Sequence, residues 1–143
     1  MKEKSNSEGN AELFQLMFDM GRLMKREMHS GTTHSVGYLP LETLRYVDEQ
    51  GKPDMQAVAD YLRVAGPSAT RLIAGLVKDG MLARVPDPAD RRRVLLSVTA
   101  AGKRACQASL RERQAAFARV IAPLSAAERA QLARILSIIT RSR

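Results

Sequence analysis

The sequence predicts a mainly α-helical α+β fold with a small β-hairpin, in which a winged helix-turn-helix is joined to a helical dimerisation subdomain. Three observations predict it. Residues 54–79 read as two short helices with a tight turn between them, the pattern of a helix-turn-helix. Two apolar segments separated by a proline- and arginine-rich loop follow directly, as expected of a hairpin wing. Long segments with apolar residues at helical spacing lie on both sides.

The composition points to a polyanionic partner or to an acidic membrane surface. The chain has 143 residues, enough for one domain, with a net charge of +8 and a pI of about 10.2. Residues 1–50 carry six basic and eight acidic side chains, whereas residues 51–104 carry ten and five. This uneven distribution argues against a diffuse basic tail.

The expected location is a reducing cytoplasm. The single cysteine, Cys106, cannot form an internal disulfide. Residues 1–9 are polar and expected to fray, and they contain no apolar signal core. No apolar run reaches the roughly 20 residues that a membrane span needs.

Two helices are expected before the central region. The first runs from Asn10 or Ala11 to about His29, with an apolar stripe at helical spacing. The second runs from Pro40 to about Gln50. The stripe of the first helix comprises Leu13, Leu16, Met17, Met20, Leu23, Met24 and Met28.

The central region has a start and stop signal for each helix. Asp54 can cap the helix that ends at Leu62. Pro67 suits the first turn of the next helix, which runs to about Asp79, because a proline has no N–H to leave unpaired there. Gly80 suits its end. Strands are expected at 81–85 and 93–99, with a loop at 86–92.

Two more helices are expected after the wing. Thr99 can cap a helix that runs to about Ala122, and Ser125 with Glu128 forms a capping box for the last helix. The terminal helices have more apolar surface than a small winged helix can cover. We therefore expect them to pack on each other and on a second copy of the chain, so that the homodimer presents two recognition helices to a palindromic site. The buried side of the helix after Thr99 is expected at Cys106, Leu110, Phe117, Val120 and Ile121.

The second helix of the motif carries the candidate DNA contacts on its outward face. Arg71 could read guanine O6 and N7, worth roughly 1–3 kcal/mol of discrimination. Ser68 and Thr70 suit phosphate or base contacts near the helix start, and Lys78 suits phosphate. The alternative is a solvated face. The inward face is expected to comprise Ala69, Leu72, Ile73, Leu76 and Val77.

Three consecutive arginines lie at the predicted wing tip. Arg91, Arg92 and Arg93 suit a narrow, electronegative minor groove. Asp90 is expected to pair with a neighbouring arginine and to order the wing. A solvent-exposed hairpin is the alternative.

These residues form a pattern that resembles the MarR (multiple-antibiotic-resistance regulator) family of transcription factors, over residues 11–141. The wing matches at Asp90-x-Arg92-x-x-x-Leu96-x-Val98-Thr99-x-x-Gly102. Ser68-x-x-Arg71-Leu72 and the run from Leu76 to Arg84 resemble the family's recognition helix and its exit. Val98 replaces the usual leucine, and Arg93 stands where a small residue is common.

The resemblance implies one MarR-like domain over residues 1–143. Residues 39–99 would form the DNA-binding lobe, and residues 10–30 with 100–141 the dimerisation lobe. Arg92 would enter the minor groove of an inverted-repeat operator while the helix from Pro67 lies in the major groove. The implied function is a sequence-specific regulator of double-stranded DNA, a repressor released by a small aromatic or phenolic effector. Relatives that sense oxidation carry a cysteine near the start of the first helix, which this chain lacks.

Other candidate sites carry less signal. Met24, His29 and His34 could line an effector pocket, although histidines beside flexible glycines are usually polar surface. Cys106 lies on an apolar stripe, as a buried, inert thiol does. Neither a metal-ligand spacing nor a catalytic or dinucleotide motif is present, so we expect no cofactor, no metal and no enzyme activity. The alternative functions are a non-specific architectural DNA-binding protein and, last, an enzyme or membrane-surface protein.

Overall fold

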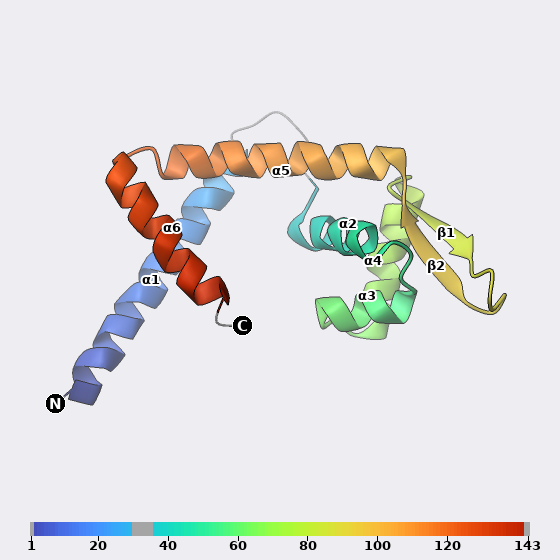
Figure 1. The fold of residues 1–143 in the computed structure, drawn as a ribbon, viewed down its shortest axis with the longest axis horizontal. Helices are drawn as coiled ribbons and strands as arrows, with labels where there is room; N and C mark the ends of the chain where they lie inside the picture. The colour runs from blue at the N-terminus through green and yellow to red at the C-terminus, as the bar shows by residue number, and fades with distance from the viewer. Residues whose placement is uncertain (1, 30–35, 142–143) are drawn as a thin grey trace. The chain divides into compact units, whose positions relative to one another are not determined.

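The fold combines helices with one β-hairpin, as predicted (Figure 1). The structure is a computed structural model that describes residues 2–29 and 36–141. For residues 2–8 and His29, which lie within the first of these ranges, it describes the backbone alone. The elements in chain order are α1 (Lys2–His29), α2 (Tyr38–Gln50), α3 (Met55–Leu62), α4 (Gly66–Lys78), β1 (Leu82–Pro86), β2 (Val94–Val98), α5 (Ala100–Val120) and α6 (Ala126–Arg141).

The chain divides into two compact units. One combines Met1–Thr32 with Glu112–Arg143, and the other is Thr33–Arg111. The division falls within α5, so the first half of this helix belongs to the same unit as the helix-turn-helix and the hairpin.

The core of the unit Thr33–Arg111 is aliphatic and draws on every element from α2 to β2. Burial of such side chains is the main stabilising term in a small fold. The core therefore fixes α4 and the hairpin relative to each other. Its buried members are Leu44, Val47, Val58, Ile73, Leu76, Leu82 and Leu96.

The hairpin is antiparallel, and its strand bounds differ from the predicted ones: β1 is displaced by one residue and includes Pro86, which was expected in the loop, and β2 is one residue shorter at each end. Leu82 pairs with Val98 and Pro86 with Val94. The predicted strand ends at Met81 and Arg93 lie outside the strands, because the Met81 amide donates to the Leu76 carbonyl (2.9 Å) and the Arg93 amide to the Asp90 carbonyl (2.9 Å). Those amides are therefore unavailable to the strand ladder.

The end of α4 explains why Gly80 stands there. Gly80 has φ of +70°, a left-handed conformation that favours glycine. Its amide donates to the Val77 carbonyl (3.0 Å), and the Met81 amide reaches Leu76, which is a Schellman motif. This motif stops the helix as the sequence predicted and directs the chain into β1.

Two predicted helix starts were wrong. α1 begins at Lys2 rather than Asn10 or Ala11. No proline lies between Lys2 and Asn10 to interrupt the helix. α2 begins at Tyr38 rather than Pro40, because a proline in the first turn costs no hydrogen bond.

The predicted caps of α3, α5 and α6 are confirmed. The Asp54 carboxylate accepts the Ala57 amide (2.9 Å), and the Thr99 hydroxyl accepts the Gly102 amide (3.0 Å). Ser125 and Glu128 bond reciprocally, with the Ser125 amide 2.8 Å from a Glu128 carboxylate oxygen.

The buried side of α5 differs from the predicted one. Gly102, Ser109 and Ala116 are its buried positions, whereas the five larger residues that were expected there are half-buried. A Cβ at Gly102 would lie 2.1 Å from the Met81 carbonyl oxygen, so only glycine fits. The Ser109 hydroxyl accepts the Val36 amide (2.9 Å).

In the unit formed by Met1–Thr32 and Glu112–Arg143, α1 and α5 are joined by polar contacts. The Arg119 guanidinium lies 2.8 Å from the Glu27 carboxylate and also donates to the Glu27 carbonyl (2.9 Å). The large apolar side chains of α1 and α6 lie mostly on the surface, and no described residue of α6 is buried.

Candidate nucleic-acid interface

Helix α4 has one face in the core and one face in solvent. Ala69, Ile73 and Leu76 are buried, and Leu72 and Val77 are half-buried against the core. This confirms the predicted inward face. The opposite face is exposed to solvent, and it carries small residues and cations. Its exposed residues are Ser68, Thr70, Arg71, Ala74, Gly75 and Lys78.

The hydroxyls and cations of α4 differ in their surroundings. Thr70 donates its hydroxyl to the Gly66 carbonyl (3.0 Å), which leaves the oxygen lone pairs as acceptors. Arg71 borders a cavity of about 450 Å³ between α4 and the start of α2. Its exposed guanidinium can serve as a fork donor for a base edge or a phosphate.

The wing tip is shaped by aspartate side chains that bond to the backbone. Asp87 accepts the Ala89 amide (2.8 Å), and Asp90 accepts the Arg92 amide (3.0 Å). The sequence reading expected Asp90 to pair with an arginine side chain. Its hydrogen bond instead goes to backbone, as in an Asx turn. Arg91, Arg92 and Arg93 are all exposed on this ordered loop.

Arg93 is held by two carboxylates. Its guanidinium lies 2.5 Å from Asp54 and 3.9 Å from Asp87. The pKa of Asp54 is lowered, first by its hydrogen bond from the Ala57 amide and second by that from Arg93. The same contact raises the pKa of Arg93. Asp54 was predicted only as a helix cap, so the structure gives it a second partner.

The predicted effector residues are only partly described. Met24 is half-buried on α1. The side chain of His29 and all of His34 lie outside the described residues.

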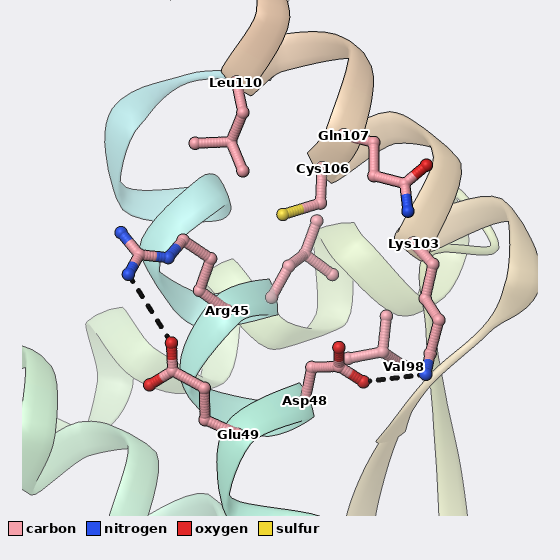
Figure 2. A pocket seen from close by; sticks show the side chains of 9 residues that line it. Arg45, Asp48, Glu49, Val98, Lys103, Cys106, Gln107 and Leu110 are labelled. Carbon is pink, nitrogen blue, oxygen red and sulfur yellow. Dashed lines mark hydrogen bonds and ion pairs between the residues drawn. The ribbon is translucent and has the colours of Figure 1, made fainter.

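A second cavity, of about 230 Å³, lies between α2 and the first half of α5 (Figure 2). Figure 2 shows the Cys106 thiol directed into it, with the Arg45–Glu49 and Lys103–Asp48 ion pairs beside it (3.5 and 2.9 Å). Burial raises the pKa of the Cys106 thiol, and the Arg45 charge opposes this only in part. Such a thiol is a weak nucleophile, as expected of an inert cysteine.

Two exposed cations near the interface were not singled out from the sequence. Arg63, in the turn between α3 and α4, has φ of +52°, which is uncommon for a residue other than glycine. Arg84 is exposed on β1, where side chains alternate between core and solvent. The signal that could have found Arg84 is the alternation with its immediate neighbours, since Ala83 and Val85 are half-buried and successive side chains of a strand point to opposite faces.

Within residues 2–29 and 36–141, no group of three or more histidine, cysteine or acidic residues could hold a metal ion. No helix in this part of the chain is long and apolar enough to span a bilayer.

Comparison with known proteins decides the family. Residues 35–93 match the model of the MarR family. Helix-turn-helix transcriptional regulators of Mycobacterium bovis and Mycobacterium tuberculosis are each 34% identical over 108 residues, which is 76% of this chain and 76% of each relative. The chain belongs to the MarR family of transcriptional regulators. MarR family members are DNA-binding helix-turn-helix regulators and not enzymes, so both assignments apply to this chain.

Solved structures of other proteins, MarR of E. coli among them, share the fold. The YusO protein of Bacillus subtilis superposes with a TM-score of 0.75 at 22% identity, over 100% of this chain and 99% of that one. A mutant MarR from E. coli gives a TM-score of 0.74 at 20% identity, over 92% and 95%. The winged-helix architecture is therefore that of the MarR family.

Proposed function

We propose that two copies of this chain bind an inverted-repeat operator in double-stranded DNA and act as a repressor that a small molecule releases. The observation that carries the proposal is the exposure of Arg71 on α4 together with Arg91 and Arg92 on an ordered wing, in a MarR family chain. The recognition helix α4 would then contact the major groove of one half-site, and the wing would contact its minor groove.

The proposed homodimer is supported by the apolar surface of α1 and α6. Phe14 and Met17 on α1 are 70% and 67% exposed, and Ile138 and Ile139 on α6 are 55% and 59% exposed. A soluble monomer rarely leaves so many large apolar side chains in water on two helices. A second copy of the chain would cover them and, by two-fold symmetry, supply the second recognition helix.

The proposed base and phosphate contacts follow from chemistry and position. Arg71 in the first half of α4 suits a guanine edge, and Lys78 at the other end of the helix suits phosphate. Ser68 and Thr70 supply short hydroxyls near the N-terminus of the same helix. Arg92 is proposed to enter the minor groove, with Arg91 beside it on the backbone.

An effector would act by weakening the contacts that α4 and the wing make with DNA. The proposed ligand is a small aromatic or phenolic anion, bound near Met24, His29 and His34. The cavity beside Arg71 offers a second place, where an anion would engage the same guanidinium as DNA. The proposed site of action is the cytoplasm.

The test is a selection experiment with the full chain. The purified protein is incubated with random duplexes, and the retained fragments are sequenced. The selected site is expected to be an inverted repeat bound at least 1,000-fold more tightly than random duplex, the lower end for specific regulators. A ratio near one would overturn the proposal and indicate an architectural DNA-binding protein. Sedimentation of wild type and Phe14→Glu tests the dimer, which the charged variant should weaken.

A further inference from the structure

Among the three wing arginines, Arg93 alone has acidic partners in the part of the chain that the structure describes. Its guanidinium contacts the carboxylates of Asp54 (2.5 Å) and Asp87 (3.9 Å). Neither Arg91 nor Arg92 has a side-chain ion pair among the described residues. The three arginines are adjacent in sequence but differ in what they are free to bind.

We propose that Arg93 is a positioning residue, which fixes the wing against the start of α3 and thereby presents Arg91 and Arg92 to DNA without contacting DNA itself. The inference rests on the proposed function, because it assigns Arg93 a role within the same DNA-binding surface. It also replaces the sequence-based expectation that all three arginines touch the duplex.

The Asp54 carboxylate is well placed to join the two elements. One oxygen accepts the Ala57 amide at 2.9 Å and caps α3. The other oxygen receives the Arg93 guanidinium. A single side chain therefore ties the first turn of α3 to the base of the wing loop, and neither contact competes with the other.

Backbone contacts also attach the wing to the segment before α3, at positions further from the wing tip than Arg93. The Leu96 amide donates to the Pro53 carbonyl (2.8 Å), and Asp54 forms an isolated antiparallel bridge with Leu95. Arg93 precedes β2, so its ion pair extends this contact from the strand into the loop that carries Arg91 and Arg92. The loop is thereby held where it joins β2 as well as by the Asp90 turn.

Such a pair matters more for order than for stability. The Arg93 side chain is 55% exposed, and exposed ion pairs contribute little to the free energy of unfolding. An anchored wing, however, loses less conformational freedom when it binds DNA. The expected effect is therefore on affinity, with little change in thermal stability.

A direct phosphate contact by Arg93 predicts something different. Each neutralised phosphate adds about 0.9 to the magnitude of the slope of log K against log salt. Loss of a positioning residue lowers affinity at every salt concentration and leaves this slope unchanged. The slope therefore separates the two roles.

The experiment compares five variants of the full chain on a duplex selected as above, over a range of salt concentrations: Arg93→Gln, Asp54→Asn, the double variant, Arg93→Lys and Arg92→Gln. Asparagine caps a helix as well as aspartate, so Asp54→Asn removes the ion pair and keeps the cap. Arg93→Gln and Asp54→Asn should each weaken binding roughly two- to five-fold with an unchanged slope. The double variant should be no weaker than either single one. Arg93→Lys should recover part of the affinity, and Arg92→Gln should reduce the slope by about one.

The proposal would be overturned if Arg93→Gln reduced the slope as Arg92→Gln does while Asp54→Asn left binding unchanged. Hydrogen exchange without DNA separates this failure from failure of the proposed function. The amides of Arg92 and Arg93 should exchange faster in Asp54→Asn and in Arg93→Gln than in wild type. Equal exchange in all three proteins would reject the positioning role, whether or not the chain selects an operator.

Discussion

A carboxylate oxygen of Asp90 accepts a hydrogen bond from the backbone amide of Arg92 at 3.0 Å. The residue proposed to enter the minor groove is therefore oriented through its own backbone. Because asparagine can accept the same bond, the charge and the turn can be separated by substitution.

Asp90→Ala should weaken operator binding several-fold, whereas Asp90→Asn should bind as well as wild type or better. Both variants remove a negative charge that repels DNA, but only alanine removes the acceptor that shapes the loop. Affinity titrations at one salt concentration measure this. Equal affinities for the two variants would show that the turn does not matter.

Arg71→Ala and Lys78→Ala should weaken DNA binding in different ways. Loss of a bidentate base contact by Arg71 should cost about 1–3 kcal/mol and relax preference at one base position. Loss of a phosphate contact by Lys78 should weaken all duplexes alike and reduce the salt slope by about one. Binding to a panel of single-base operator variants at several salt concentrations distinguishes them. A uniform loss for Arg71→Ala would assign that residue to the backbone.

Gly102→Ala should lower the free energy of unfolding by about 1–3 kcal/mol, the usual cost of overpacking. The new Cβ would lie 2.1 Å from the Met81 carbonyl oxygen, so α5 would have to move away from the segment between α4 and β1. Urea denaturation measures the effect, and Gly9→Ala is a control because nothing lies within 4 Å of a Cβ there. Stability equal to wild type would contradict this packing.

The stability difference between wild type and Asp54→Asn should depend on pH. The pKa of Asp54 is lowered in the folded state below its ordinary 3.8, so its ionised form stabilises the fold above that value. As the pH falls through the lowered pKa, the carboxylate binds a proton and this contribution is lost. Thermal unfolding from neutral pH to about pH 3 should show the difference shrinking. A difference that grows on acidification would contradict the stabilising role of the ionised Asp54 carboxylate, which accepts from the Ala57 amide and from Arg93.

Cys106 should react slowly with a thiol-specific disulfide reagent at neutral pH. Burial raises the pKa of the thiol, so little thiolate is present to attack. The rate should rise when the protein is unfolded in urea, which serves as the control. Reaction as fast as that of a free thiol would reopen the possibility of a redox sensor.

The predicted features that proved right are those governed by local chemistry. Asp54, Thr99 and the pair Ser125–Glu128 cap helices within three residues of themselves. Gly80 ends α4 through its own backbone conformation. Such signals depend on a short stretch of chain, so they can be found in the sequence.

The missed features depend on contacts between distant segments. Arg93 and Asp54 are 39 positions apart, and no spacing rule links them. Gly102 and Ser109 are buried on α5 because they are small, whereas a search for apolar stripes gives weight to large residues. The DNA contacts themselves stay predictions, and the exposure of Arg71 and Arg92 meets the first condition for them.

Hydroxyl-radical footprinting on a selected operator tests the central claim most directly. Two bound copies should protect two half-sites whose centres lie about one helical turn or a whole multiple apart, with the minor-groove protection lost in Arg92→Ala. A single protected half-site, or a footprint that Arg92→Ala leaves intact, would contradict the account of a dimer whose wings enter the minor groove.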